Sequence, residues 1–436
     1  MTDVYFVNDT TTAKNWGARG TTRALRGLVE ETGANITHTL YLSEMSKRKP
    51  LLLHHIFPDR VRRYIVKNYG IQESYLWFQR NITGKSHLEA FKSYESLTSN
   101  WDTVPGSWNE FDNFASKVKK EELLEPVAEA IQATDIVVIN GEGSIYDRQR
   151  KGRMMLFVAY LAKEYFDTDT ILVNHTADLS DKEMRKMAAN VYPILDDVVF
   201  REPASADHVS NVIQNVEYRT AADAAFVYDP IKDHNSWETV ANRNGYYSVW
   251  PDSAAGFDLT EDYICVGGSS IYNRPDRPPY DPVPAFQNLC QRLKSEVGPV
   301  VLTACSGDID IIRPIADELD LPVIGPRTPI QQLVDVFGNA SLFISGRWHS
   351  SVYALTGGVP IITLTANTHK TKGILDLVGL DQPVFDALDL DSEVESIVSL
   401  AEELIQSPVK KDLQNRSVEL SDSTRSNIRY IEKYPQ

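Results

Sequence analysis

The chain has 436 residues, of which 42% are hydrophobic and 24% are charged, and its formal net charge at pH 7 is −16. A chain of this length exceeds one ordinary hydrophobic core, so we expect two domains. Proteins that bind nucleic acid need a clustered basic surface to contact phosphates, and the acidic balance of this chain argues against that class.

The cysteines predict neither a disulfide framework nor a metal site. Cys265, Cys290 and Cys305 are odd in number and far apart, and no CxxC or Cys/His ligand spacing occurs. No apolar run approaches the roughly 20 residues that a membrane-spanning helix requires. Residues 1–7 lack the basic flank and long apolar core of a signal peptide. We therefore expect a cytoplasmic protein with reduced thiols.

The N-terminal region reads as a strand, a turn and a helix. The apolar residues 4–7 predict the strand and residues 23–29 predict the helix, and the turn between them contains Asn15 and Gly17. A glycine in such a turn lets a ligand approach the backbone and the helix N-terminus. Glycines also occur in plain strand-to-helix connections, so both roles stay open for this turn.

A basic segment interrupts the acidic chain between residues 47 and 85, where nine Lys or Arg residues face only Asp59 and Glu73. Aromatic residues are interleaved with these cations. Aromatic rings suit sugar faces, and cations suit acidic glycans or anionic lipid head groups. The segment predicts either an acceptor-binding insertion with peripheral membrane contact or a helical insertion whose charges are solvated.

A regular series of strands and helices follows this segment. Apolar runs at 134–139, 170–173 and 197–200 predict buried strands, each followed by polar or small residues and a helix. Alternating strands and helices imply a parallel sheet whose ligands lie beyond the carboxyl ends of the strands. The candidate binding residues at these ends are Asn140, Gly141, Glu142, Gly143, Arg201 and Ser205.

A second α/β series begins after a polar linker at about 228–262. The predicted strands are 263–266, 300–303, 321–324, 342–344 and 361–364. The candidate binding residues at their ends are Gly267, Gly268, His369, Lys370 and Lys372. Apolar residues at helical spacing between 394 and 405 predict a C-terminal helix that packs across both domains.

The segment 345–351 carries the strongest chemical pattern of the chain. It follows the predicted strand 342–344 and contains Arg347, His349, Ser350 and Ser351. We expect the two serines to cap a helix that runs to residue 356, so that its N-terminus forms an anion site beside the Arg347 fork. The alternative is that Arg347 pairs with a surface carboxylate and His349 only begins a helix.

These motifs together resemble the polysaccharide pyruvyl transferase family. The matching positions, in order, are Asn15-Trp16-Gly17, residues 140–144, Arg201-Glu202-x-x-Ser205, residues 223–226, Arg347-x-His349 with Ala354 and Pro360, and residues 368–373. The Arg-x-His motif is the most specific part of the resemblance. Trp348 stands where a smaller aliphatic residue is common in the family.

The resemblance implies an α/β fold with two facing Rossmann-like domains, similar to the glycosyltransferase B type. We predict an N-terminal domain at 1–240, which carries the basic, aromatic-rich insertion at about 45–120. The C-terminal domain is predicted at 260–385 and carries the Arg-x-His motif. A helical tail at 386–436 is predicted to pack across both domains.

The resemblance also implies an enzyme that transfers a pyruvyl group from phosphoenolpyruvate to a sugar diol as a ketal. The predicted catalytic residues are His349, as acid or base, and Arg347. The donor carries a carboxylate and a phosphate, for which Arg201, Lys370 and Lys372 supply further cations. The predicted substrate-binding residues are Asn15, Gly17, Asn140, Gly141, Glu142, Gly143, Arg201, Ser205, Gly267, Gly268, Ser350, Ser351, His369, Lys370 and Lys372.

We expect no metal and no cofactor other than phosphoenolpyruvate as co-substrate. The expected partners are this donor and a glycan or lipid-linked saccharide acceptor, and not nucleic acid. Two alternatives remain open from the sequence. One is a nucleotide-sugar-dependent glycosyltransferase of similar two-domain fold, and the other is a non-catalytic glycan-binding protein that keeps the fold.

Overall fold

The computed structural model describes residues 1–41, 45, 75, 78–84, 89, 93, 102–214, 216–249, 252–254, 256–274 and 277–434. Eight of the nine basic residues predicted to form the insertion lie outside these residues, and so does its predicted role in acceptor or membrane binding. The C-terminal part of the predicted insertion is described and is helical, with η2 (Trp108–Glu110) and α5 (Phe111–Lys119).

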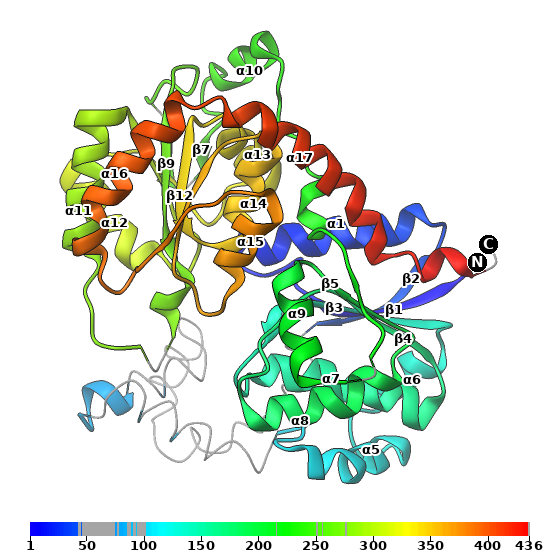
Figure 1. Cartoon of the computed structure of the whole chain (residues 1–436). Coiled ribbons are helices and arrows are strands. Elements are labelled where there is room, and N and C mark those ends of the chain that lie inside the picture. Colours follow the sequence, from blue (N-terminus) through cyan, green and yellow to red (C-terminus); the bar gives the residue numbers. More distant parts are fainter. Residues whose placement is uncertain are drawn as a thin grey trace.

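Within the described residues, two six-stranded parallel sheets organise the fold, one in each half of the molecule (Figure 1). The first sheet has the order β2-β1-β3-β4-β5-β6 and the second has the order β11-β10-β9-β12-β13-β14. The strands of the first sheet are β1 (Asp3–Asp9), β2 (Asn35–Tyr41), β3 (Ile136–Ile145), β4 (Asp169–Ala177), β5 (Asp197–Phe200) and β6 (Arg219–Thr220). Those of the second are β9 (Ile264–Ser269), β10 (Val300–Thr303), β11 (Val323–Ile324), β12 (Leu342–Gly346), β13 (Ile361–Leu364) and β14 (Val384–Phe385). A short antiparallel pair, β7 (Ser248–Val249) and β8 (Asp252–Ser253), lies between the two series in sequence.

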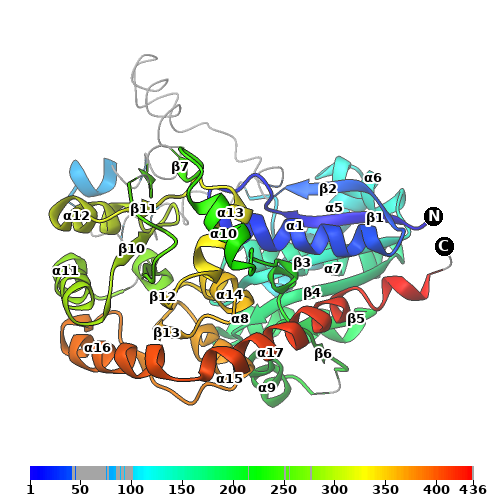
Figure 2. The same ribbon diagram turned by 90° about the horizontal axis from the view of Figure 1, so that it is seen from above.

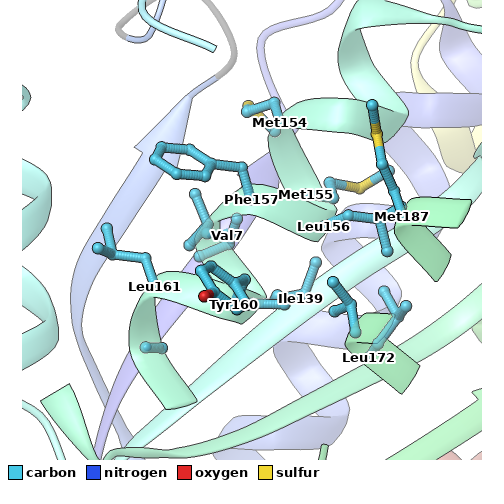
Figure 3. Packing of buried hydrophobic residues seen from close by; sticks show 14 of the residues in the cluster. Val7, Ile139, Met154, Met155, Leu156, Phe157, Tyr160, Leu161, Leu172 and Met187 are labelled. Carbon is cyan, nitrogen blue, oxygen red and sulfur yellow. The ribbon is translucent and has the colours of Figure 1, made fainter. Parts of the chain in front are cut away.

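Helices cover both faces of the first sheet because its central strands are apolar on both sides. In β3, residues 136–139 are all fully buried, and they pair in register with residues 4–7 of β1. One face is covered by α5, α6 (Glu125–Gln132), α7 (Arg150–Phe166), α8 (Lys182–Val191) and α9 (Pro203–Val212). Figure 3 shows the α7 side chains, such as Phe157, packing with Val7, Ile139 and Leu172 of the strands. The other face is covered by α1 (Trp16–Glu31), η4 (Ala224–Val227) and the C-terminal segment.

The second sheet is covered in the same way. One face packs against α11 (Val283–Arg292), α12 (Ile309–Leu319) and α16 (Leu390–Gln406). The other packs against α13 (Ile330–Gly338), α14 (Trp348–Thr356), α15 (Lys370–Val378) and α17 (Val409–Ser423). The remaining helical segments are α10 (His234–Ala241), η3 (Tyr192–Ile194), η5 (Ser270–Asn273), η6 (Leu293–Val297), η7 (Thr424–Asn427) and η8 (Ile431–Lys433).

The C-terminal segment joins the two halves. Figure 2 shows α16 beside α11 and α17 extending from there towards the first sheet, where the two termini lie together. Ile428 and Ile431 are buried in the core of the first sheet, and the side chain of Asn427 accepts from the Asn174 N–H at 3.0 Å. The predicted fold of two Rossmann-like domains with a C-terminal helix across both is therefore confirmed. The helix that spans the domains is α17 with the residues after it, whereas the predicted helix at 394–405 lies in α16 and packs on the second sheet.

Two local expectations were wrong. The helix after β12 begins at Trp348 with Arg347 as its N-cap residue, so Ser350 and Ser351 lie inside the helix and do not cap it. The Ser351 hydroxyl instead donates to the Arg347 carbonyl at 3.0 Å. The predicted glycine turns after residues 139 and 266 are continuations of β3 and β9, because those strands keep pairing with their neighbours.

No helix of the described residues is long and apolar enough to cross a membrane.

Candidate functional site

A cavity of about 640 Å³ lies where the carboxyl ends of strands from both sheets meet. It is lined from the first domain by residues 15–18, 142–144 and 146–149 and by Arg201, and from the second domain by Ser270, Asn273, Arg274, Cys305, residues 347–350, Asn367 and Lys370. Parallel α/β sheets bind ligands at the carboxyl ends of their strands, at the point where the order of strands in the sheet reverses. The position of the cavity and its mixed lining make it the candidate active site.

Arg347 is held in the cavity by a buried carboxylate. It follows β12, and its guanidinium forms a two-pronged ion pair with Asp308, in which Nε lies 3.0 Å from Oδ2 and Nη2 contacts Oδ1. Asn273 accepts from Nη2 at 2.7 Å when its amide nitrogen donates to the Gly307 carbonyl. Burial alone would lower the pKa of Arg347, but the charges of Asp308 and Cys305 raise it overall. The fork is therefore charged and fixed in orientation.

Arg201 is the second cation of the cavity and is almost fully buried, with 1% of its side chain exposed. It follows β5, and its Nη1 lies 2.8 Å from Asp223 Oδ2 while its Nε donates to Thr176 Oγ1 at 2.9 Å. Its guanidinium stacks over the Trp348 ring at 4.6 Å from the ring centre, a favourable cation–π contact. A side chain at Gly143 would meet Nη2 at 2.8 Å, so the glycine leaves this face of the guanidinium open.

Lys370 is the third cation and differs from the two arginines. It is the first residue of α15, is buried, and donates from Nζ to Asn367 Oδ1. No carboxylate within the described part of the chain pairs with it. Burial first, and then the charges of Arg201 and Arg347, lower the pKa of Lys370 to about 7. The side chain of Lys370 can therefore change between the ammonium and the neutral amine form near neutral pH.

His349 lies among these groups. Its Nε2 lies 3.3 Å from Asp223 Oδ2 and 3.4 Å from Arg201 Nη1, and its side chain is 15% exposed. An ideal Cβ at Gly17 would lie 2.5 Å from His349 Nδ1, so the ring lies close to the start of α1. A titratable ring beside two cations at the cavity wall can move a proton to or from a bound anionic substrate.

Glu142 brings a carboxylate to the same wall. It has a positive φ of 48°, and its oxygens accept from Thr10 Oγ1 at 2.6 Å and from Lys151 Nζ at 2.7 Å. Burial alone would raise the pKa of Glu142, but the charge and hydrogen bond of Lys151, the Thr10 hydroxyl and the charge of His349 lower it overall. Glu142 therefore stays ionised and adds a negative charge to the cavity lining.

Cys305 also lines the cavity but is not set up as a nucleophile. Its thiol donates to Asp308 Oδ2 at 3.1 Å, and burial raises the pKa of Cys305 to about 12. All three cysteines of the chain are buried and free. Among the described residues, no group of three or more His, Cys, Asp or Glu side chains is arranged to hold a metal ion.

The structure brings together many of the residues that the sequence singled out. Those that line the cavity are Asn15, Gly17, Glu142, Gly143, Arg201, Arg347, His349, Ser350 and Lys370. The others lie elsewhere. Asn140 and Gly141 are buried beneath the cavity, where the Asn140 amide donates to Thr22 Oγ1 at 2.8 Å and a side chain at Gly141 would collide with His175. Lys372 is 56% exposed and pairs with Asp376 on its own helix.

The glycines of β9 serve packing. A Cβ at Gly267 would lie 2.6 Å from Thr303 Oγ1, and one at Gly268 would lie 2.7 Å from Asp308. Gly268 thus leaves room for the carboxylate that holds Arg347. Ser351 is buried inside α14.

Ser205 and His369 form a separate contact between the domains. The Ser205 backbone N–H donates to Glu202 at 2.7 Å, and its hydroxyl lies 3.2 Å from His369 Nε2. Neither residue lines the cavity.

Sequence reasoning gave no role to the two carboxylates that orient the cavity cations, Asp223 and Asp308, although residues 223–226 are among the positions of the family resemblance. Both follow strands of the parallel sheets, Asp223 shortly after β6 and Asp308 after β10. Their position after a strand could have marked both aspartates as candidate site residues. It could not have predicted which arginine each of them pairs with. Asn273 and Asn367, which contact Arg347 and Lys370, lie in connections that carried no pattern.

A comparison with protein families matches residues 41–368 to the polysaccharide pyruvyl transferase model. The chain belongs to this family. A search of curated proteins found no significant match. The match includes the Arg347-x-His349 motif and ends just before Lys370.

Solved structures share the two-domain architecture at low sequence identity. Anabaena HepE (Alr3699) in complex with UDP aligns with a TM-score of 0.51 and 11% identity over 100% of both chains. The spinosyn rhamnosyltransferase SpnG gives 0.50 and 11%, again over 100% of both chains. The UDP-GlcNAc 2-epimerase from Methanocaldococcus jannaschii gives 0.50 and 12%, over 99% of both chains. These likenesses show a fold of the glycosyltransferase B type and nothing of the reaction.

Proposed function

We propose that this member of the polysaccharide pyruvyl transferase family moves the pyruvyl group of phosphoenolpyruvate onto a sugar diol and leaves it there as a ketal. The observation that carries the proposal is the grouping of Arg201, Arg347, Lys370 and His349 around one cavity at the strand ends. A donor with a carboxylate and a phosphate needs several cations in a site that excludes most water.

The three cations divide the work of binding this donor. Arg201 and Arg347 are each paired with a buried carboxylate, Asp223 and Asp308, which fixes the direction of their remaining N–H groups. Lys370 has no such partner in the described chain, so a bound anion would supply its counter-charge. The arginines thus orient the donor, and Lys370 contributes a positive charge that no carboxylate of the described residues pairs with.

The reaction requires two proton movements. The two acceptor hydroxyl oxygens form bonds to C2 of the donor, the bond between C2 and the phosphate oxygen breaks, and C3 becomes a methyl group. Of the two protons that leave the hydroxyls, one ends on C3 and the other on the released phosphate. His349 is the residue at the cavity that moves a proton in these steps, and no cofactor is needed beyond the donor itself.

The family implies a glycan acceptor, and the part of the cavity lined by residues 142–149 offers groups that suit sugar hydroxyls. Glu142 accepts hydrogen bonds, and Tyr146 and Gln149 line the same side. We assign this side to the acceptor diol, because an ionised carboxylate would repel the donor's anionic groups.

Thermal unfolding in the presence of candidate donors tests the proposal. A ligand that binds only the native state raises the melting temperature by mass action, so phosphoenolpyruvate should raise it and UDP-sugars should not. Release of phosphate in the presence of a panel of diol sugars then identifies the acceptor. Stabilisation by a nucleotide sugar alone would replace this proposal with glycosyl transfer, and binding of glycans without any turnover would replace it with a non-catalytic role.

A further inference from the structure

Asp223 is a buried carboxylate that collects hydrogen bonds from both domains. Oδ1 accepts from Thr21 Oγ1 at 2.7 Å and from the Ala225 N–H at 2.9 Å, both in the first domain. Oδ2 faces Arg201 Nη1 at 2.8 Å, and it also faces Trp348 Nε1 at 2.9 Å and His349 Nε2 at 3.3 Å, the last two from α14 of the second domain. The side chain has no exposed surface.

The charge of Asp223 decides which nitrogen of His349 carries the proton in the neutral ring. Burial alone would raise the pKa of Asp223, but His349, Arg201 and the Ala225 N–H lower it overall, so the group is an anion that only accepts hydrogen bonds. A lone pair on Nε2 would face this anion unfavourably, whereas an N–H there donates to it. The contact of Nε2 with Arg201 Nη1 is the longer one, at 3.4 Å, so the carboxylate is the nearer of the two partners of this nitrogen.

The other nitrogen, Nδ1, is left free for chemistry. No hydrogen bond to it occurs within the part of the chain that the structure describes. The ring edge with Nδ1 faces Gly17, where an ideal Cβ would lie 2.5 Å away, and the Gly17 N–H is already donated to Asn15 Oδ1 at 2.9 Å. Asn15, Gly17 and His349 all line the cavity.

We infer that Asp223 is a positioning residue that holds His349 as the tautomer protonated on Nε2, which makes Nδ1 the atom that exchanges a proton with the substrate. Nδ1 takes one of the two protons that leave the acceptor hydroxyls and returns it to C3 or to the departing phosphate. This step rests on the proposed pyruvyl transfer, whereas the tautomer is a property of the protein alone.

The contact also depends on how the two domains dock. Asp223 belongs to the first domain and His349 to the second, so the correct tautomer is enforced only when the two domains are together. The same carboxylate oxygen receives the Trp348 N–H, which ties the start of α14 to the first domain. The tautomer therefore depends on the docking of α14 against the first domain.

The wild-type protein provides the first test. NMR correlation of ring nitrogens with ring protons reports the tautomer of each of the nine histidines, and a His349→Ala variant identifies the signals of His349. The expected result at a pH where the ring is neutral is Nε2–H with an unprotonated Nδ1. Finding Nδ1–H in the wild-type protein would overturn the assignment, whether or not any variant folds.

Asp223→Asn provides the second test, with Thr21→Val as its matched control. An asparagine amide can turn its NH2 towards Nε2 and favour the opposite tautomer, so turnover at saturating donor should fall on the order of 10²- to 10⁴-fold. Thr21→Val removes a different Asp223 partner, and it should cost stability but keep the tautomer and the pH profile of turnover. An Asp223→Asn protein that keeps the wild-type tautomer would show that the residue is only structural.

Gly17→Ala tests the reactive atom. The added methyl group would lie 2.5 Å from Nδ1 and 2.7 Å from Cβ of His349, so the Nδ1 edge is obstructed or the ring shifts, and turnover should fall. Unchanged turnover in this variant would remove Nδ1 from the mechanism. If phosphoenolpyruvate does not bind at all, the proposed function fails, but the tautomer measurement still decides the role of Asp223.

Discussion

Lys370 should make donor binding depend on pH, because its pKa is lowered to about 7 in the empty cavity. The donor needs the ammonium form, and a bound phosphate keeps that form protonated. Above pH 7, binding must therefore also take up a proton. The protonated fraction of a group with this pKa falls from about one half at pH 7 to about 1% at pH 9, so the apparent Kd should rise roughly 50-fold over that range. The phosphate of the donor is already fully ionised there, since its second pKa is about 6.

Calorimetric titration of phosphoenolpyruvate at several pH values, in buffers of different ionisation enthalpy, measures both the affinity and the proton uptake. Lys370→Met should weaken binding at pH 7 by about 1.5–3 kcal/mol, the usual worth of a hydrogen bond to a charged group, and should abolish the proton uptake. Lys372→Met is the matched control, because it removes the same charge from the same helix at an exposed position paired with Asp376. It should leave affinity and pH dependence unchanged.

The same lysine should cost the empty protein stability. A lowered pKa in the folded state means that the ammonium is disfavoured there, so the cost is fully present below pH 7 and disappears as pH rises past the unfolded value near 10.4. Lys370→Met should therefore raise the melting temperature of the unliganded protein, more at pH 6.5 than at pH 10. A variant that loses stability and leaves the pH dependence of binding intact would refute the assignment of Lys370 to the donor.

Three further variants separate binding from chemistry. Arg347→Lys keeps the charge but loses the two-pronged contact with Asp308, so calorimetry should show weaker donor binding, with normal binding arguing against a role in orientation. His349→Ala should keep donor affinity within a few-fold and lower phosphate release by roughly 10²- to 10⁴-fold, and near-normal turnover would remove the ring from the mechanism. Gly143→Ala places a methyl group 2.8 Å from Arg201 Nη2 and should raise the donor Kd without a large loss of melting temperature. If the donor affinity and the melting temperature of Gly143→Ala both fall strongly, the substitution has instead caused a packing defect.

Part of this protein is determined by local sequence alone. Apolar runs such as residues 136–139 and 342–344 form buried strands because only a sheet covered on both faces can bury every side chain of a run. In parallel sheets the carboxyl ends of the strands share an edge, and this rule places Arg201 and Arg347 each at that edge of its own sheet. The facing of the two domains then brings both to one cavity. The family resemblance rests on the same strand-end positions, so the sequence alone is enough to show it.

The sequence could not separate a glycine that admits a ligand from one that admits a neighbouring side chain. Gly143 leaves Arg201 open to the cavity, whereas Gly268 makes room for Asp308, and the two have the same local pattern after an apolar run. The difference depends on which residue the fold places opposite each Cα. Ser205 shows the same difficulty. It follows a strand as expected, but it contacts Glu202 and His369 and does not line the cavity.

Only the tertiary structure decided the electrostatics of the site. Asp308 follows β10 and pairs with Arg347, which follows β12 on the other side of β9, and Asp223 reaches His349 from the other domain. No spacing in the chain encodes these pairs, because they arise from the order of strands in each sheet and from the docking of the two sheets. Lys370 and Lys372 are two residues apart, about 200° round the helix, so one is buried beside two arginines and the other is exposed to water. Their chemical difference is set by burial and neighbouring charge, which exist only once the chain has folded.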